Sequence, residues 1–359
     1  MEKTIGVLGA SGFVGRNLVN ELIEHTKYTI IVASRTQQKL QELYHQVDRI
    51  TDIVAVEAGD KKSLRRLYAE LDMIINCSGP TPLLNTIPAE LAVEESIPYV
   101  ESGVSLLNEH EKSVREIDQH AKERNILLVT GAGVFPGISR VLLQLAATSL
   151  DRVDTIKISV LFNNRLSIGS AVDMLVESQK RATVFEHGKW INLRVGSSRE
   201  TISFPPPFNT QHAYASPPVD TQLHFPKNIQ NFSLRTGTCS LLSDAILLTH
   251  SINTDSYQLT KIMGRFLKYT SAINQYFAPR GCVMRMDASG EKNEDTKTMN
   301  VSLYHPDTFI ATASVIAQGV DSLLKNKFKE PGVFTFGEVI NPIELLHKLR
   351  LKNFYVEGI

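Results

Sequence analysis

The chain has 359 residues, 42% of them hydrophobic, and its 38 basic residues equal its 38 acidic residues in number. This length predicts two domains with full cores, and a balanced charge without a basic stripe argues against nucleic acid or a membrane as partner. Three cysteines do not suggest a disulfide framework, and no apolar run approaches the ~20 residues that span a bilayer. The first strand begins where a signal peptide would need its apolar core, so we expect a cytoplasmic protein.

Three glycines follow the first apolar strand, residues 5–8, at the spacing of a dinucleotide-binding turn. Gly9 permits the tight turn, Gly12 lets a phosphate approach the backbone, and Gly15 lets the next helix lie close to the strand. That helix is amphipathic, and the free N–H groups and positive dipole at its start face a pyrophosphate. The alternative is an ordinary corner between a strand and a helix.

The end of the second strand, residues 28–33, indicates which dinucleotide is bound. NAD enzymes carry an acidic residue there for the ribose 2′-hydroxyl, whereas this chain has Ser34, Arg35 and Thr36, with Lys39 one helical turn on. Hydroxyls and a guanidinium suit a 2′-phosphate, so we predict NADP(H) and not NAD or FAD held in this manner. The alternative is a solvated arginine at a helix start. After the third strand, residues 50–57, Asp60 is expected either to border the adenine or only to cap the helix at 61–71.

Strands and helices alternate through the first 135 residues. Further strands are predicted at 72–76, 98–101 and 126–130, with helices near 86–96 and 108–124. This alternation predicts an α/β fold with a Rossmann-like, doubly wound parallel sheet. Ligands of such sheets lie beyond the carboxyl ends of the strands, so the loops that begin at Cys77, Glu101 and Gly131 are expected to join the glycine turn around one crevice.

The pattern changes at about residue 152. Strands are predicted at 155–161, 183–195 with a turn at Gly188, 198–204, 232–236, 283–288 and 299–304, with helices near 168–182 and 255–278. The proline-rich segment 204–226 is predicted to be a long loop over the substrate crevice. We therefore expect a Rossmann domain at 1–137 and an inserted α+β substrate or dimerisation domain at 138–304. Residues 305–359 are expected to form a helix and tail that return to the first domain.

Five motifs of the chain occur together in one known family. They are Gly9-x-x-Gly12-x-x-Gly15, Asn76-Cys-Ser-Gly-Pro80, Tyr99-Val-Glu-Ser102, Gly131-Ala-Gly133-Val-Phe-Pro136-Gly137 and Glu330-Pro-Gly332-Val-Phe. This set resembles the saccharopine dehydrogenase-like oxidoreductases, over residues 1 to about 140 and again from about 305 to 340. The resemblance implies NADP(H) as cofactor and places Gly133, Val134, Phe135, Pro136 and Gly137 beside the nicotinamide. Amino-acid-handling members have Asp where this chain has Phe135, which favours a more apolar or larger substrate than saccharopine.

Hydride transfer needs the nicotinamide held against an electrophilic carbon, and a proton donor unless the acceptor is already protonated. Tyr99 and Glu101, at the carboxyl end of a strand, are the first catalytic candidates, and Tyr214 is a further one. The segment 204–226 also offers His212 and His224. Five arginines are candidates to hold a substrate carboxylate, namely Arg140, Arg165, Arg181, Arg235 and Arg285. The ten histidines lack metal-ligand spacing, so we predict no metal site.

These residues predict an NADP(H)-dependent oxidoreductase acting on a small imine, carbonyl or enoyl substrate, either a carboxylate or a carrier-bound group. We expect it to be a homodimer. One alternative is an NADP(H)-sensing binding protein without turnover. The other is an extended short-chain dehydrogenase or epimerase that uses Tyr257 and Lys261 at the Tyr-x-x-x-Lys spacing. The expected cofactor contacts are Gly9, Ser11, Gly12, Phe13, Val14, Ser34, Arg35, Thr36, Lys39, Asp60, Cys77, Ser78, Gly79, Pro80, Gly133, Val134 and Phe135.

Overall fold

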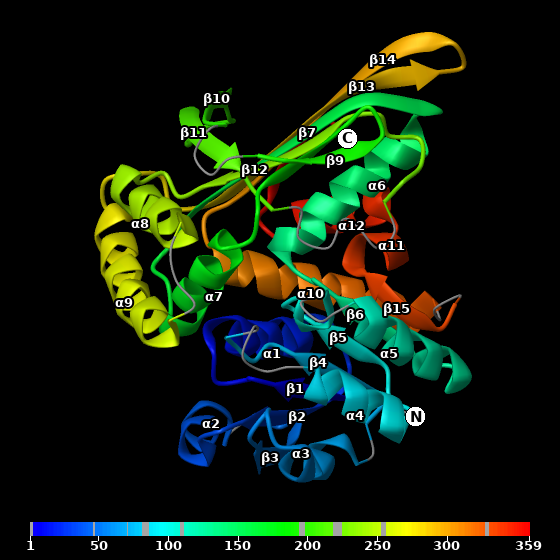
Figure 1. Cartoon of the computed structure of the whole chain (residues 1–359). Coiled ribbons are helices and arrows are strands. Elements are labelled where there is room, and N and C mark those ends of the chain that lie inside the picture. The colour runs from blue at the N-terminus through cyan, green and yellow to red at the C-terminus, as the bar shows by residue number, and fades with distance from the viewer. Residues whose placement is uncertain are drawn as a thin grey trace. The chain divides into compact units, whose positions relative to one another are not determined.

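The computed structural model describes residues 3–45, 47–69, 71–80, 86–107, 111–193, 198–217, 225–252, 256–326 and 330–359 (Figure 1). The chain forms two compact units. Unit 1 comprises Met1–Ile138 and Phe309–Ile340, and unit 2 comprises Ser139–Thr308 and Asn341–Ile359. Residues 305–359 are expected from the sequence to return to the first domain, whereas Asn341–Ile359 belong to unit 2.

Unit 1 contains the predicted doubly wound sheet. Its seven parallel strands lie in the order β15-β6-β5-β4-β1-β2-β3. Every residue of β4, β5 and β6 is buried, as expected for strands covered on both faces. The Rossmann-like fold class is therefore confirmed. The strand bounds are β1 Thr4–Leu8, β2 Thr29–Ser34, β3 Ile50–Ala55, β4 Met73–Asn76, β5 Tyr99–Glu101, β6 Leu127–Thr130 and β15 Gly332–Thr335.

The strand β15 was not expected, because the sequence predicts a sheet that ends near residue 130. It pairs in parallel with β6, from Gly332 opposite Leu127 to Thr335 opposite Thr130. A run of four residues that begins at Gly332, directly after Glu330-Pro331, is too short to show a strand period, so the pattern alone does not reveal it. The prediction of the sheet's last strand is therefore wrong.

Helices α3, α4 and α5 share one apolar core with the sheet of unit 1. The helix expected at 306–326 is α10, and it contacts other parts of unit 1. Tyr28 donates to Asp321 at 3.0 Å, and a Cβ on Gly319 would lie 2.4 Å from the Phe336 ring, so the glycine is what admits that ring. The bounds are α1 Phe13–His25, α2 Gln37–Tyr44, α3 Lys61–Tyr68, α4 Ile87–Glu95, α5 Glu111–Glu123, α10 Thr308–Asn326 and α11 Phe336–Val339, with short helical turns η2 Ser105–Leu107 and η3 Val134–Ile138.

Unit 2 contains a mixed sheet in the order β10-β11-β12-β7-β13-β14-β16, with the hairpin β8–β9 attached to β12. Strands β7 and β12 run parallel, β13 pairs antiparallel with β7, and β13 and β14 form a long hairpin. This is the α+β architecture that the sequence predicts. The bounds are β7 Arg152–Asn163, β8 Thr183–Glu186, β9 Lys189–Asn192, β10 Glu200–Ser203, β11 Thr210–Ala215, β12 Phe232–Gly237, β13 Gly281–Lys292, β14 Asp295–His305 and β16 Tyr355–Glu357.

The strand β11 corrects the prediction of an unbroken loop at 204–226. It pairs with β10 from Thr210 to Ala213 and with β12 at Tyr214 and Ala215. The prolines of this segment lie before or after β11, at 205–207, 217, 218 and 226, so none of them removes a hydrogen bond from the strand. Residues 218–224 lie outside the described part of the chain.

Helices α7, α8 and α9 of unit 2 pack together through a small apolar cluster that includes Ala171, Leu175 and Leu267. Gly264 lies against Val172, since a Cβ there would be 3.3 Å from Cγ2 of that residue. Among the described residues no helix has both the length and the apolar composition that a membrane crossing requires. The bounds are α6 Ser139–Ser149, α7 Ile168–Ser178, α8 Leu241–Ile252, α9 Tyr257–Asn274 and α12 Pro342–Arg350.

Candidate functional site

The carboxyl ends of β1 and β4 form the candidate site of unit 1. β1 has β2 on one side and β4 on the other, so the strand order reverses there, and such a switch point is where doubly wound sheets bind their ligands. The two turns that follow these strands are in contact. The Cys77 amide donates to the Leu8 carbonyl at 2.8 Å, and a Cβ on Gly9 would lie 2.7 Å from the Cys77 carbonyl carbon.

The glycine turn has the geometry that its sequence predicts. Gly9 has φ +83°, a conformation that favours glycine, and its amide donates to the Ala33 carbonyl of β2 at 2.8 Å. A Cβ on Gly15 would lie 2.2 Å from the Gly9 carbonyl oxygen, so only glycine lets α1 start this close to β1. The buried Tyr44 hydroxyl of α2 donates to the Ala10 carbonyl at 2.7 Å and so stabilises the turn.

The start of α1 offers room for an anion. Gly12 is the residue before the helix, it is exposed, and no side chain caps the helix there. Because the first N–H groups of a helix have no partner within it, those of Phe13 and Val14 point outward at this end. The Phe13 ring packs 5.1 Å from the Phe309 ring, with the Arg16 guanidinium 4.9 Å from its centre. A helix start that has no side-chain cap and is preceded by a glycine can accommodate the pyrophosphate of a dinucleotide.

The residues after β2 lie at the neighbouring corner of the same edge. Ser34 is buried, and its hydroxyl lies 3.5 Å from the Thr36 carbonyl oxygen, while Arg35, Thr36 and Lys39 are exposed. The first turn of α2 contains no acidic residue. A guanidinium, an ammonium and a hydroxyl thus face solvent where NAD enzymes place a carboxylate. Asp60 caps α3, accepting a hydrogen bond from the Lys62 amide at 3.0 Å.

Glu101 is the centre of a buried hydrogen-bond cluster at the ends of β5 and β6. It is 1% exposed and accepts from the Tyr99 hydroxyl at 3.0 Å, the Thr130 hydroxyl at 2.5 Å and the Leu106 amide at 3.2 Å. The Ser105 hydroxyl also donates to it. The carboxylate therefore joins β5, β6 and the turn η2.

Tyr99 belongs to the same cluster and is 0% exposed. Its hydroxyl accepts from the Asn76 side-chain amide at 2.9 Å and donates to Glu101. Burial, and secondarily the charge of Glu101, raise the pKa of Tyr99 well above its ordinary value. Both side chains are shielded from solvent, so their placement does not support the expectation that Tyr99 and Glu101 catalyse by contact, which stays a prediction. Both shape the loops that border the crevice.

The turn after β4 is held by the same network. The Asn76 side-chain oxygen accepts from the Ser78 amide at 2.9 Å, and the Asn76 carbonyl accepts from the Ser102 amide at 2.9 Å. Burial raises the pKa of the Cys77 thiol to about 12, so it stays protonated at neutral pH. Gly79 is exposed and Ser78 and Pro80 are half-buried, which leaves this turn open to a cofactor.

The loop after β6 makes a tight helical turn. Gly133 has φ +131°, and a Cβ there would lie 2.7 Å from the Thr312 methyl group of α10. The Ile138 amide closes the turn on the Gly133 carbonyl at 3.0 Å. Val134 is buried, whereas Phe135 is half-buried and extended, with φ −135° and ψ 126°. Phe135 is therefore the large side chain of this loop that retains exposed surface.

The remaining catalytic and anchoring candidates belong to unit 2. Tyr214 lies half-buried on β11, and His212, on the same strand, has its Nδ1 3.2 Å from the Thr201 hydroxyl. His224 lies outside the described residues. Arg140 is buried in α6, while Arg165 and Arg181 are exposed.

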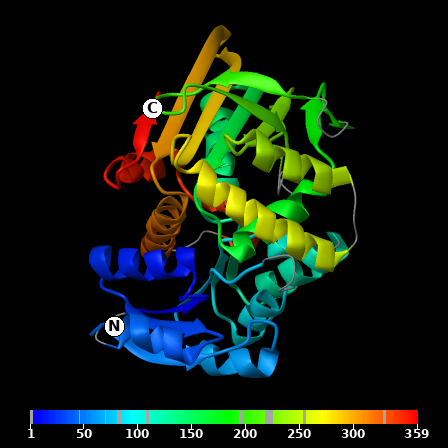
Figure 2. The same ribbon diagram turned by 90° about the vertical axis from the view of Figure 1, so that its left-hand side faces the viewer.

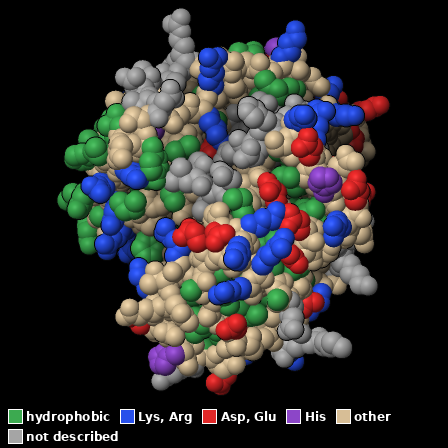
Figure 3. Space-filling model, turned by 60° about the horizontal axis from the view of Figure 1, so that its bottom comes forward, with side chains coloured by type: hydrophobic (Ala, Val, Ile, Leu, Met, Phe, Trp, Pro, Cys, Tyr) green, Lys and Arg blue, Asp and Glu red, His purple; other side chains and the backbone are tan. Residues whose placement is uncertain are grey.

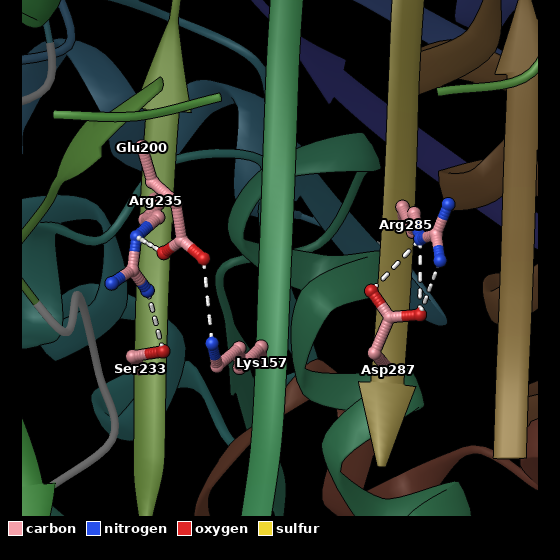
Figure 4. A network of polar contacts seen from close by, with 6 residues as sticks. All are labelled: Lys157, Glu200, Ser233, Arg235, Arg285 and Asp287. Carbon is pink, nitrogen blue, oxygen red and sulfur yellow. Dashed lines mark hydrogen bonds and ion pairs between the residues drawn. The ribbon is translucent and has the colours of Figure 1, made fainter. Parts of the chain in front are cut away.

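Two of the arginines already have carboxylate partners on one face of the sheet of unit 2 (Figure 4). Arg235 lies 2.6 Å from Glu200, which also pairs with Lys157 at 3.3 Å. Arg285 donates to both oxygens of Asp287 at 2.7–3.0 Å. Their guanidinium groups serve ion pairs within the sheet, so the hypothesis that they await a substrate carboxylate is not supported.

Tyr257 and Lys261 do not form a short-chain dehydrogenase pair. The Lys261 ammonium lies over the Tyr257 ring, 4.2 Å from its centre, and both residues are on α9 of unit 2. In the enzyme class the lysine acts on the hydroxyl beside the nicotinamide. The geometry here is a surface cation–π contact.

Comparison with known proteins agrees with the site in unit 1. The family model described as the saccharopine dehydrogenase NADP binding domain matches residues 5–129. Residues 5–129 are thus similar to the NADP binding domain of saccharopine dehydrogenases. A protein of Caenorhabditis elegans named "Lipid droplet localized protein" is 27% identical over 138 residues, 35% of this chain. That match spans about a third of the relative's length, 32%.

Solved structures show the same fold for the whole chain. Apo saccharopine dehydrogenase (L-Glu forming) from Saccharomyces cerevisiae superposes with a TM-score of 0.70 over 99% of this chain and 100% of its own, at 14% identity. An engineered D-amino acid dehydrogenase bound to NADP⁺ gives a TM-score of 0.51 over 96% of each chain, at 13% identity. A probable dehydrogenase from Thermotoga maritima gives 0.52 over 98% of each chain, at 11% identity.

Unit 1 contains supporting residues that the sequence pattern does not reveal. They are Tyr44, Ser105 and Thr130. None of them belongs to a sequence motif, because each supports the site through a hydrogen bond to another element. Asn76 begins the Asn-Cys-Ser-Gly-Pro motif, and its place at a strand end was the signal that pointed to it. No group of three metal-ligating side chains occurs among the described residues.

Proposed function

We propose that this protein is an NADP(H)-dependent oxidoreductase that transfers a hydride to or from a small substrate. The observation that carries the proposal is the cradle of Gly9, Gly12 and Gly15 at the switch point of a saccharopine dehydrogenase-type domain. When bound, NADP(H) supplies or accepts the hydride. The chain's own residues bind the pyrophosphate at the start of α1 and border the nicotinamide with the loop 133–137. Isothermal titration with NADPH and NADH tests the cofactor step directly.

The preference for NADP(H) over NAD(H) rests on the exposed residues after β2. Arg35 and Lys39 supply two positive charges and Thr36 a hydroxyl, with no carboxylate in the first turn of α2 to repel a 2′-phosphate. Charge-assisted hydrogen bonds to a phosphate are about twice as strong as neutral ones. A 2′-phosphate therefore gains contacts that a 2′-hydroxyl cannot make.

Arg35→Ala is expected to weaken NADPH binding by about 1–3 kcal/mol, tenfold or more, and NADH binding much less. Titration of both cofactors measures the two affinities. Arg66→Ala is the matched control, because Arg66 is also exposed in unit 1 but lies in the last turn of α3. Equal losses of affinity for NADPH and NADH would show that Arg35 does not bind the 2′-phosphate.

The buried cluster around Glu101 favours an imine among the possible substrates. Tyr99 and Glu101, the titratable groups that the sequence places at this edge, are hydrogen-bonded to each other and shielded from solvent. A protonated imine accepts a hydride without a proton from the protein, whereas a carbonyl or enoyl acceptor needs one. We therefore propose imine reduction, or the reverse amine oxidation, as the reaction of first choice. Oxidation of NADPH with a panel of cyclic imines, 2-oxo acids and enones tests it.

Phe135 is proposed to border the substrate and to set its class. An apolar side chain with exposed surface beside the nicotinamide excludes water and contacts an apolar substrate. Phe135→Asp is expected to lower kcat/KM for apolar imines by tenfold or more, with NADPH affinity nearly unchanged. Phe135→Leu is expected to keep most of the activity. Early melting of both variants, with normal turnover of the folded fraction, would instead identify Phe135 as a core residue.

An NADP(H)-sensing protein without turnover is the second candidate, because the same burial of Tyr99 and Glu101 removes two proton donors from the crevice. It predicts tight NADPH binding with no loss of absorbance at 340 nm, the NADPH band, for any acceptor in the panel. A cytoplasmic location and a homodimer remain predictions. Cell fractionation and light scattering test them.

A further inference from the structure

The surface formed by α8, α9 and the turn after α9 exposes a continuous set of large apolar side chains. We call it the α8–α9 face (Figure 2). Tyr276 and Phe277 are 80% and 83% exposed, and Leu241 is 70% exposed. The space-filling view shows apolar side chains on this face interspersed with lysines and arginines (Figure 3). The face consists of Leu241, Leu242, Leu259, Ile262, Phe266, Tyr269, Ile273, Tyr276 and Phe277.

The helix α9 has a buried side of mostly small residues and, opposite to it, an exposed side of large apolar residues. Thr260, Gly264, Leu267 and Ser271 are buried, and this side packs on α7 and α8. The exposed apolar residues of α9 follow one another at intervals of three and four, from Leu259 to Ile273. This spacing places them in a single stripe along the helix. A stripe that no described element covers is a surface for a partner.

The start of α8 extends this stripe. The Ser243 hydroxyl lies 2.9 Å from the Thr270 hydroxyl, and the Asn274 side chain reaches the Cys239 carbonyl at 3.4 Å. These bonds hold the beginning of α8 beside the end of α9. Leu241 and Leu242 therefore lie near the carboxyl end of the stripe and widen it.

Basic residues lie along one side of the stripe. Lys261, Arg265 and Lys268 each stand one position before an exposed apolar residue, and at 100° per residue they lie about 100° around the helix from the centre of the stripe. Residues 256–286 contain no aspartate or glutamate. The chain as a whole is neutral, but this face is locally cationic.

We propose that the α8–α9 face binds peripherally to an anionic phospholipid surface. Aromatic and aliphatic side chains enter the interface between headgroups and acyl chains, and flanking lysines and arginines reach the headgroup phosphates. A second copy of the chain is a poorer partner, because residues 256–286 offer no carboxylate to pair with the lysines and arginines of the other copy. The expectation of no membrane partner, which rested on overall charge, is revised for this surface.

Flotation with vesicles tests the proposal on the full chain. The protein is expected to float with phosphatidylcholine vesicles that contain about one third phosphatidylserine, to float less with phosphatidylcholine alone, and to be released by salt. Lys261→Ala with Lys268→Ala is expected to weaken partitioning roughly tenfold or more. Phe266→Asp with Ile273→Asp is expected to abolish it.

The control is Ile343→Asp with Leu351→Asp, which changes exposed apolar residues of unit 2 outside the α8–α9 face and is expected to leave flotation unchanged. Thermal unfolding of each variant confirms that it is folded. Absence of flotation, or an equal loss in the control, would overturn the proposal. So would a dimer in light scattering that Phe266→Asp with Ile273→Asp dissociates while vesicle binding persists, because the face would then join two copies.

Discussion

Gly12→Val is expected to abolish NADPH binding while the protein remains folded. Gly12 has φ −77° and ψ 172°, a conformation that valine adopts readily, and the nearest contact of a new Cβ is the Gly9 carbonyl oxygen at 3.2 Å. The branched side chain would occupy the space in front of the helix start, where the pyrophosphate must approach the backbone. Affinity for NADPH is expected to fall at least about a hundredfold, which a fluorescence titration measures.

Gly15→Val is the comparison variant for Gly12→Val, because it is expected to disturb the fold as well as the cofactor site. Its Cβ would meet the Gly9 carbonyl oxygen at 2.2 Å, so the turn or α1 must move, and we expect a lower melting temperature as well as lost binding. Gly12→Val should melt within a few degrees of the wild type. If Gly12→Val binds NADPH normally, the pyrophosphate does not lie at this turn.

Glu101→Leu is expected to be the most destabilising single change in the candidate site. The carboxylate accepts hydrogen bonds from three hydroxyls and from the Leu106 amide, and leucine accepts none. Buried donors without an acceptor each cost about 1–3 kcal/mol, so a total loss of about 3–5 kcal/mol is expected, even with some rearrangement. Thermal unfolding should show a fall of about 10 °C for unit 1.

Tyr99→Phe is the companion variant that tests whether this cluster positions or catalyses. It removes one hydroxyl and keeps the ring, so we expect a loss of about 1 kcal/mol in stability and an unchanged kcat. A tyrosine that donates a proton to substrate would lose turnover by about a hundredfold or more. If Tyr99→Phe melts normally but turns over that slowly, Tyr99 is a catalytic residue after all.

The strands of unit 1 were predictable because buried parallel strands appear as short apolar runs between turns. Residues 5–8 and 126–130 are examples, and the glycines after β1 made the turn recognisable as well. β11 and β15 were not predictable in the same way. β11 has the polar sequence Thr-Gln-His-Ala-Tyr-Ala, which lacks the apolar alternation of a strand. β15 depends on β6, a neighbour from a distant part of the chain.

In the candidate site, too, some features were predictable from the sequence and others were not. Glycine positions follow from backbone geometry, so Gly9 and Gly15 were assignable from spacing alone. The place of Tyr99 and Glu101 at a strand end was also correct. Whether such side chains face the crevice or the interior depends on Thr130 and Ser105, which lie 29 and 4 residues from Glu101. A sequence pattern does not contain that information.

Because β15 lies near the end of the chain, it is translated long after its partner strand β6. The edge of β6 that β15 covers is formed by Leu127–Thr130, while its partner Gly332–Thr335 is translated only after almost all of unit 2. During that interval unit 1 has an apolar strand with unpaired backbone groups, the kind of edge on which nascent chains aggregate. The protein is therefore expected to depend on chaperones more during translation than its finished sheet suggests.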